Sequence, residues 1–542
     1  MLLFAFTGAP AEQKQKPGML SPFQTVLAAA GFDVESLHLQ WPLLERFYAN
    51  RQGRLVWHEK GRLNSLAKSL IDWISSVDRE GLSPADYHLE TLGYFSSLTL
   101  GKTQQLRDLV LTDAFFRLAM DLRIGRFNPK EVDPQWRLPA ESFDPAEFLE
   151  AFLEQDPTVQ SLDMLRPLTV AYDRLRDAYE QYLQIEKAGG WPRITVKYTL
   201  RPGAIDPAVK LLRERLRIEG DHPDSEPDDP WRYDGQLKSA VRHFQRRNGL
   251  LDDGVVGPLT RSVLNIPAER RIKQLLANME RWRWLPRDLG EHYLLVNTAG
   301  YELALVFDGE TVVHKRTITG RQKRQTPSFK SRITHLVVNP EWTVPRVIAV
   351  EDLLPKQQLD LEFLDQRGIR VLQQQAGQWV QLDAKTIDWS QYNKDNFPFL
   401  LRQESGPKNS LGRIKFHMNN PYAIFLHDTP AVGLFRKPIR AFSSGCVRVQ
   451  EADHLARYLL DSGGQSVEEL IDLPLQSGDT LVTKLSNPIE VYLTYFTSWV
   501  DSEGDVQFRP DIYQRNAGLL LALKGSEKRL ADHREQALVE SF

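Results

Sequence analysis

The spacing of hydrophobic positions changes along the chain and divides it into regions. Between residues 22 and 195, apolar residues recur at three- and four-residue intervals, for example over 109–122 and 165–185. This spacing is typical of amphipathic helices, so we predict a helical domain over 22–195. Its Trp57 and Trp73 are interpreted as core residues and not as a ligand-binding surface.

A short module over 204–266 follows a Gly-Gly-Trp-Pro break. It contains two short amphipathic segments and then a glycine-punctuated turn over 247–260. Gly254 and Gly257 suit positive φ, and Pro258 suits the first turn of a further helix. The pattern therefore predicts a small module of three helices.

From residue 292 the hydrophobic period becomes two. Three alternating runs between 292 and 319 are separated by Ala-Gly and Asp-Gly turns, and the alternation returns at 423–427, 480–483 and 489–496. This pattern predicts a mostly antiparallel β domain over 267–522. A Gln-rich stretch over 346–410 interrupts it. We expect this insertion to be a lid, and its polar composition argues against a large core of its own.

The two ends of the chain differ from these regions. Residues 1–21 begin with a short apolar run followed by small residues, which we interpret as a leader or signal-peptide remnant or as a disordered end. Residues 523–542 form a polar C-terminal tail. The overall prediction is a multidomain α+β protein with a helical domain, a three-helix module and a β domain carrying an insertion.

Composition narrows the classes of function. Apolar residues make up 42% and charged residues 26% of the chain, as in ordinary globular proteins. The formal net charge of −3 is close to balance, so it gives no argument for nucleic acid or an anionic membrane as partner. No run of about 18 apolar residues is present that could span a bilayer.

The chain contains one cysteine, Cys446, so no intramolecular disulfide can form. An oxidising compartment penalises spare thiols, and a single retained thiol is therefore a candidate for chemistry. The alternative is a buried cysteine that behaves as a small apolar residue.

One segment has the composition of a nucleophilic site. His427 ends a predicted strand, and Ser443-Ser444-Gly445-Cys446-Val447-Arg448 begins sixteen residues later. A nearby imidazole can activate a thiol by forming a thiolate–imidazolium pair. Backbone N–H groups around Gly445 and Cys446 are candidate oxyanion donors. The alternative is that His427 is a structural histidine at a strand end and Arg448 an ordinary surface charge.

No metal or cofactor is expected. His417 and His427 lie ten residues apart without a second cysteine, which argues against zinc. No phosphate-binding glycine motif occurs between a predicted strand and helix.

The cysteine segment resembles the catalytic motif of the L,D-transpeptidase family, in which a histidine is followed by Ser/Thr-His-Gly-Cys-x-Arg/Asn. The module resembles the three-helix peptidoglycan-binding domain through Phe244-Gln245 and the Asp-Gly-x-x-Gly-Pro turn. The layout resembles the long form of the family, which has a scaffold domain and a capping insertion. Further matching segments are Gly320-Arg321, Gln325-Thr326-Pro327, 339–345 and 411–416.

The resemblance implies roles for individual residues. Cys446 matches the acylated nucleophile, His427 its base, and Gly445 the glycine before the nucleophile. Ser444 stands where many members have a second histidine, and a backbone carbonyl is preferred to the Asp428 carboxylate as the group orienting His427.

Trp342 resembles an aromatic floor beside the site, and Phe425 replaces a frequent tyrosine. The substrate-binding candidates are Arg448, Ser444, Ser443, Trp342, Phe425, Asp428 and Thr429.

The resemblance also implies a periplasmic enzyme that forms 3→3 cross-links between peptidoglycan tetrapeptide stems through a thioester, with release of D-Ala. Such activity would contribute to cell-wall biogenesis and to cell shape. It would also give tolerance of β-lactams other than carbapenems, whereas carbapenems would inhibit the enzyme covalently. Expected partners are stem peptides and glycan, with other wall synthases and D,D-carboxypeptidases as further candidates. The alternatives are an L,D-carboxypeptidase, in which water is the acceptor, and an inactive wall-binding scaffold.

Overall fold

The structure is a computed structural model that describes residues 38–96, 102–155, 159–223 and 227–525. The predicted leader and residues 526–542 of the predicted tail lie outside these ranges. The chain forms two compact units, one comprising the N-terminal part to Arg123 with Ser142–Arg166 and the other Ile124–Glu141 with the chain from Pro167. The predicted multidomain α+β architecture is confirmed.

The first unit is helical and has its own core. Trp57 is completely buried, and its indole N–H donates a hydrogen bond to Thr112 Oγ1 over 2.8 Å, while Trp73 packs against the same core. Both therefore have the predicted structural role. The elements are α2 (Trp41–Asn50), β1 (His58–Glu59), β2 (Arg62–Leu63), α3 (Ser65–Ser75), α4 (Leu89–Ser96), α5 (Lys102–Arg123) and α7 (Pro145–Glu154).

The second unit includes part of the predicted helical region. Helix α8 (Val170–Lys187) packs against α12 (Ala268–Arg283), and the two share a buried core with the C-terminal hairpin of β16 (Ser498–Val500) and β17 (Val506–Phe508). The short α6 (Pro129–Val132) also belongs to this unit. The region predicted as one helical domain over 22–195 is thus divided between the two units. Residues 516–525 are helical, and Leu523, the first residue of the predicted tail, is buried in this core.

The module has three helices, as predicted: α9 (Pro207–Ile218), α10 (Gly235–Arg247) and α11 (Pro258–Leu264). Gly254 has the expected positive φ of 70°, and Pro258 opens α11. The expectation for Gly257 was wrong, because this residue caps the N-terminus of α11 with a φ of −81°.

The β domain contains a nine-stranded sheet in the order β13-β5-β14-β12-β11-β6-β15-β3-β4. Because β4 also pairs with β5, the sheet closes into a ring, from which β13 alone is left out. Most neighbouring strands are antiparallel, and the parallel pairs are β12–β14, β13–β5 and β15–β3. The strands are β3 (His292–Asn297), β4 (Glu302–Phe307), β5 (Glu310–Gly320), β6 (Phe329–Val338), β11 (Ile414–Met418), β12 (Leu426–His427), β13 (Ala441–Ser443), β14 (Val447–Val449) and β15 (Leu481–Thr494).

Side chains of the central strands alternate between the core and the opposite face of the sheet. Phe416, Leu426 and Val447 are completely buried in a core shared with helix α16 (Ala452–Asp461). Because successive side chains of a strand point to opposite faces, the residues next to these three are directed away from that core. This alternation positions the candidate site.

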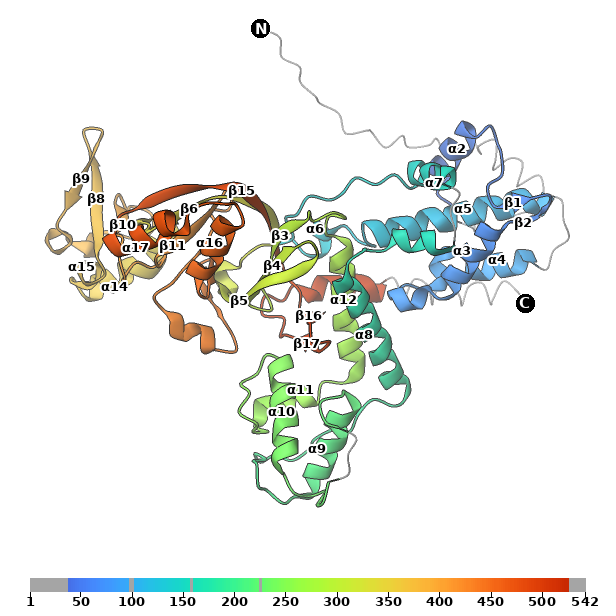
Figure 1. The fold of residues 1–542 in the computed structure, drawn as a ribbon, viewed down its shortest axis with the longest axis horizontal. Coiled ribbons are helices and arrows are strands. Elements are labelled where there is room, and N and C mark those ends of the chain that lie inside the picture. Colours follow the sequence, from blue (N-terminus) through green and yellow to red (C-terminus); the bar gives the residue numbers. More distant parts are fainter. Residues whose placement is uncertain (1–37, 97–101, 156–158, 224–226, 526–542) are drawn as a thin grey trace, which may run out of the picture. The chain divides into compact units, whose positions relative to one another are not determined.

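The insertion forms a compact subdomain with a hydrophobic core of its own, although its polar composition argues against a large one. A four-stranded sheet in the order β7-β10-β8-β9 packs with the buried rings of Trp389, Phe397 and Phe399. Strands β8 and β9 extend as a hairpin in Figure 1. The elements are β7 (Trp342–Thr343), α13 (Arg346–Ile348), α14 (Leu354–Leu359), α15 (Phe363–Gln366), β8 (Ile369–Gln375), β9 (Gln378–Leu382) and β10 (Leu400–Gln403), and α17 (Leu473–Ser477) follows later in the chain.

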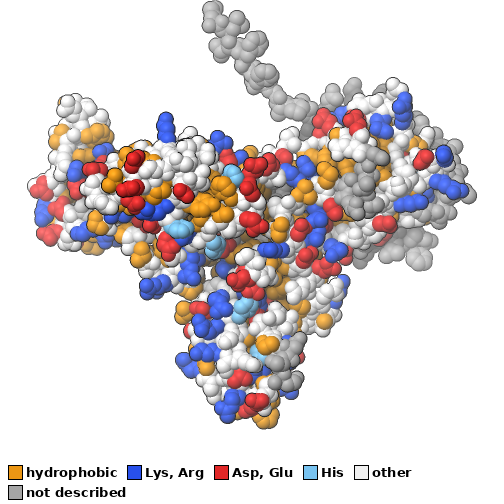
Figure 2. Space-filling model, viewed as in Figure 1, with side chains coloured by type: hydrophobic (Ala, Val, Ile, Leu, Met, Phe, Trp, Pro, Cys, Tyr) orange, Lys and Arg blue, Asp and Glu red, His pale blue; other side chains and the backbone are white. Residues whose placement is uncertain are grey.

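On the face drawn in Figure 2, Lys and Arg side chains are interspersed with Asp and Glu side chains. Within the described ranges, no helix combines the length and the apolar character needed to cross a membrane.

Candidate active site

Cys446 lies in the tight turn between β13 and β14. Gly445, directly before it, has a φ of 116°, a conformation that favours glycine. The Ser443 hydroxyl donates to the Cys446 carbonyl over 2.5 Å and accepts from the Gly445 N–H over 3.2 Å. Thr326 Oγ1 donates to the Gly445 carbonyl over 2.7 Å. Four hydrogen-bonding groups of the motif are therefore fixed by contacts with the loop itself and with Thr326.

His427 is buried at the end of β12, next to the strand that follows Cys446. In the parallel pair β12–β14, His427 lies opposite Arg448, and on the other side Lys415 of β11 lies opposite His427. Opposite residues in neighbouring strands project to the same face. Cys446 is two residues before Arg448 and shares this face by alternation. The structure therefore brings the predicted nucleophile, base and Arg448 to one face of the sheet, which we call the cysteine face.

A backbone carbonyl orients the imidazole, as predicted. His427 Nδ1 lies 2.5 Å from the carbonyl oxygen of Asp428. A proton on Nδ1 satisfies this contact and leaves Nε2 with the lone pair that a base requires.

Burial favours the uncharged forms of both groups. It lowers the pKa of His427 to about 4, with further lowering by the Arg448 guanidinium. Burial also raises the pKa of the Cys446 thiol, an effect opposed by the Phe425 backbone N–H and by the cations Lys415 and Arg448. The expected thiolate–imidazolium pair is therefore disfavoured in the resting site, where a neutral thiol lies on the same face as a neutral imidazole.

The two expected oxyanion donors differ in availability. The Gly445 N–H already donates to Ser443 Oγ. The Cys446 N–H has no hydrogen-bond partner among the residues that the structure describes. Only the second group is free to bind a developing oxyanion.

Ser444 connects the cysteine turn to the insertion. Arg324 Nη1 donates to Ser444 Oγ over 2.9 Å and to Asp352 Oδ2 over 2.7 Å. Arg321 also donates to Asp352, over 2.7 Å, and Arg324 pairs with Glu351. Asp352 and Glu351 belong to the insertion, so we call this group the Arg324 network.

Three other predicted binding residues have structural partners elsewhere. The Asp428 carboxylate accepts a hydrogen bond from the Arg413 N–H over 2.8 Å, because its side chain follows His427 and projects to the other face. Thr429 is buried, and its hydroxyl accepts from the Ala431 N–H over 3.2 Å. Trp342 lies in β7, is half-buried and packs against the core of the insertion, and its role as an aromatic floor beside the site stays a prediction.

Phe425 remains near the site, directly before β12. The Lys415 ammonium lies 4.0 Å from the centre of the Phe425 ring, and the ring stacks on His417 at 5.4 Å. Neither Lys415 nor Arg324 is among the site residues predicted from the sequence. The available signal for Lys415 was its polar position within the alternating run 414–418.

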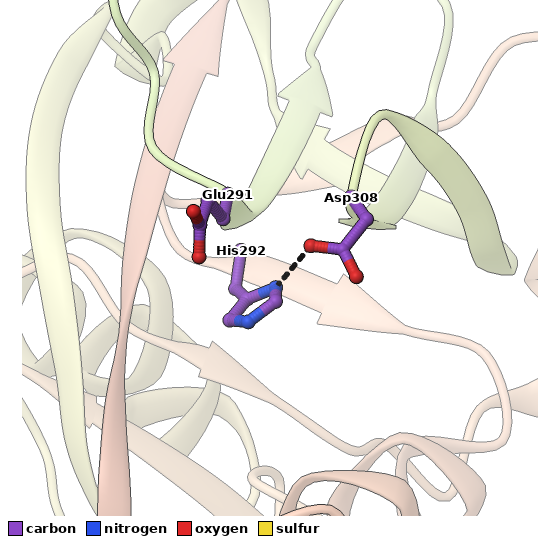
Figure 3. Close-up of side chains that lie close together, drawn as sticks. All are labelled: Glu291, His292 and Asp308. Carbon is purple, nitrogen blue, oxygen red and sulfur yellow. Dashed lines mark ion pairs between the residues drawn. The ribbon is translucent and has the colours of Figure 1, made fainter.

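Two groups of side chains in the described ranges have the spacing of possible metal ligands, and neither includes Cys446. Glu291, His292 and Asp308 lie together where β3 begins and β4 ends, with His292 Nδ1 4.0 Å from Asp308 Oδ1 (Figure 3). Asp501, Glu503 and Asp505 form the second group. The first group is exposed throughout and the second partly so, and exposed acidic groups are common without an ion, so we assign no metal site.

Comparison with known families identifies three regions. Residues 291–481 match the family described as "L,D-transpeptidase catalytic domain", which includes the cysteine face. Residues 206–264 match the "Putative peptidoglycan binding domain" family and residues 42–178 the "Scaffold domain" family.

Among curated proteins, a "Putative L,D-transpeptidase" of Haemophilus influenzae is 36% identical over 255 residues, which cover 47% of this chain and 50% of the relative. The chain thus spans about half the length of that relative. Two solved structures are similar only weakly. An L,D-transpeptidase from Mycobacterium smegmatis is 10% identical, with a TM-score of 0.18 and coverage of 38% of this chain and 58% of that one. An L,D-transpeptidase from Xylanimonas cellulosilytica is 16% identical, with a TM-score of 0.17 and coverage of 56% and 98%.

Proposed function

Since the chain carries an L,D-transpeptidase catalytic domain beside a scaffold domain and a peptidoglycan-binding domain, we propose that it forms 3→3 cross-links between peptidoglycan tetrapeptide stems. The observation that carries the proposal is the cysteine face. There His427 and Arg448 lie opposite each other on parallel strands, with Cys446 two residues before Arg448.

The first half-reaction forms a thioester. His427 takes the thiol proton as Cys446 Sγ attacks the carbonyl of the third stem residue, the L-centre of a diamino acid. The Cys446 N–H donates to the oxyanion of the tetrahedral intermediate. The bond to the fourth residue then breaks, and its amine leaves as D-Ala with the proton from His427.

The second half-reaction transfers the acyl group. The side-chain amine of a second stem attacks the thioester carbonyl, and His427 accepts the proton that this amine loses. When the tetrahedral intermediate collapses, the carbon–sulfur bond breaks, the 3→3 amide is complete and Cys446 returns to the thiol as His427 gives back the proton. We propose that the insertion over 346–410 acts as a lid that limits water near the thioester and so favours the amine acceptor.

The proposal also assigns a role to the module and a cellular compartment to the enzyme. Residues 204–266 would hold the chain on glycan and raise the local concentration of stems. The substrate places the enzyme in the periplasm, where its cross-links would contribute to wall biogenesis, cell shape and tolerance of non-carbapenem β-lactams.

The test is an assay of purified protein with disaccharide-tetrapeptides, read by mass spectrometry of the products. The proposal predicts dimers with a 3→3 amide together with free D-Ala, and neither product from Cys446→Ala. Tripeptide without dimer would identify an L,D-carboxypeptidase instead. If the protein forms no product and Cys446 resists every thiol reagent, the inactive scaffold is the correct reading.

A further inference from the structure

Lys415 lies on β11, which pairs with β12, and its positive charge can act electrostatically on Cys446. It lies opposite His427, and its side chain projects to the cysteine face. Its ammonium reaches the ring of Phe425, at 4.0 Å from the ring centre. Phe425 is in turn connected to β14, the strand that follows Cys446, because its carbonyl accepts a hydrogen bond from the Val447 N–H over 3.0 Å. The Lys415 ammonium therefore lies on the cysteine face beside Phe425, whose backbone is hydrogen-bonded to the residue that follows Cys446.

Among the residues that the structure describes, Lys415 and Arg448 are two cations without a carboxylate partner. Within the described part of the chain, neither forms an ion pair with an Asp or Glu, and burial disfavours the charged form of each. A partly buried charge is costly unless an opposite charge compensates it. Both cations interact favourably with the Cys446 side chain when it is a thiolate. The negative charge of this thiolate raises the pKa of Lys415 and the pKa of Arg448.

The charged groups around Cys446 come from each neighbouring element. His427 projects from β12, Lys415 and His417 from β11, and Arg448 from β14. Arg324 reaches Ser444 beside the nucleophile, but Asp352 and Glu351 already compensate its charge. A positive charge on buried His427 is opposed by both Arg448 and Lys415.

We propose that Lys415 supplies the main counter-charge for the Cys446 thiolate, with Arg448 as the second cation, while His427 only carries the proton. In this step the proton moves from Sγ to the imidazole, Lys415 keeps its own three protons, and no other bond changes. The inference rests on the proposed function for the identity of the nucleophile and extends it by assigning the thiolate's electrostatic partner.

The test measures the pH dependence of Cys446 alkylation by iodoacetamide in the full chain. Cys446 is the only cysteine, so alkylation reports on this thiol alone. Lys415→Met should move the midpoint of the rate–pH curve upward by about one unit and lower the rate at pH 7.5 about tenfold. Lys415→Arg should restore most of both values, and Lys415→Gln provides a second neutral variant if the methionine variant folds poorly.

Two further variants make the result decisive. Lys484→Met removes an exposed cation opposite His335 on the same sheet and should leave the midpoint unchanged. His427→Gln should not raise the midpoint. An unchanged midpoint in both neutral Lys415 variants, or a rise in His427→Gln equal to that expected for Lys415→Met, would overturn the proposal. Because alkylation needs no peptidoglycan substrate, this outcome is distinguishable from failure to form cross-links.

Discussion

At the residue scale, the site depends on two groups that burial keeps uncharged. His427 is 4% exposed and is bordered by Arg448 and Lys415, and its Nδ1 is engaged by a backbone carbonyl. Cys446 follows a glycine whose conformation and hydrogen bonds fix the turn. The reaction must therefore create the thiolate and the imidazolium together, as the substrate binds.

This arrangement predicts the pH dependence of acylation. The pKa of His427 is lowered to about 4, so the imidazole stays a competent base throughout pH 5–8. The pKa of Cys446 is raised, so the thiolate fraction grows as the pH increases past neutrality. The rate of acylation by a carbapenem, followed by intact-protein mass spectrometry, should show no inflection near pH 6.5 and should rise toward pH 9. A separate inflection near pH 6.5, below which the rate falls more steeply than the thiolate fraction, would indicate that His427 titrates normally.

At the element scale, the insertion is fixed to the cysteine turn at its base. Arg324 contacts Ser444 of the turn and both Asp352 and Glu351 of the insertion. The insertion also has a core of its own, so a movement of the lid would carry it as a body and not as a loop that becomes ordered. The insertion therefore has more internal packing than its polar, Gln-rich composition led us to expect.

Breaking the Arg324 network should affect chemistry more than stability. Arg324→Ala removes the donor to Ser444 and frees the base of the insertion, and small displacements of a reacting group lower rates strongly. We expect carbapenem acylation to slow about tenfold or more, with a change in unfolding free energy of about 1 kcal/mol or less. The matched control is Arg370→Ala, which removes an exposed ion pair with Glu404 within the insertion and should leave the rate unchanged. Equal rates in the two variants would contradict the positioning role.

The local hydrophobic pattern predicted many helices and strands, but it could not predict contacts between residues that are distant in the sequence. The alternating runs correspond to β3, β4 and β5, and the helical runs to α5 and α8. Closure of the sheet depends on pairings such as β12–β14, which no local period encodes. The segments 480–483 and 489–496 were expected as separate, yet most of both lie in the single strand β15, whose register shifts between Lys484 and Ile489.

The core of the insertion and the Arg324 network also depend on contacts that local sequence patterns do not predict. The core of the insertion uses Trp389, Phe397 and Phe399 from irregular segments, so it shows no periodicity. Cys446 and His427 could be singled out because their motif lies within one short stretch. Arg324 could not, because its partner Asp352 is distant in sequence and joins it only in the folded chain.

At the scale of the whole molecule, the module is bound to the rest of the second unit through buried charges. The Tyr182 hydroxyl of α8 donates to Glu219 over 2.6 Å, and His243 of α10 lies 2.7 Å from both Asp221 and Asp505. Arg247 pairs with Asp221 in the interior of the module. The module is therefore attached by specific contacts as well as by the chain.

Removing the module should separate wall binding from chemistry. A variant lacking residues 204–266, with Tyr182→Phe to remove the hydroxyl left without Glu219, should still be acylated by a carbapenem. It should sediment with purified sacculi less than the full chain carrying Tyr182→Phe alone. Equal sedimentation of the two proteins would make the module a structural spacer without a role in glycan binding.

The proposed function requires that Cys446 carries the acyl group of a stem peptide. The most direct measurement is the intact mass of the protein after mixing with a tetrapeptide donor whose side-chain amine is acetylated, so that no acceptor amine is present, followed by rapid acid quenching. We predict the added mass of one tripeptide acyl group on the peptide that contains Cys446, and no addition to Cys446→Ala. An acyl group on another residue, or release of D-Ala by Cys446→Ala at the wild-type rate, would contradict the account.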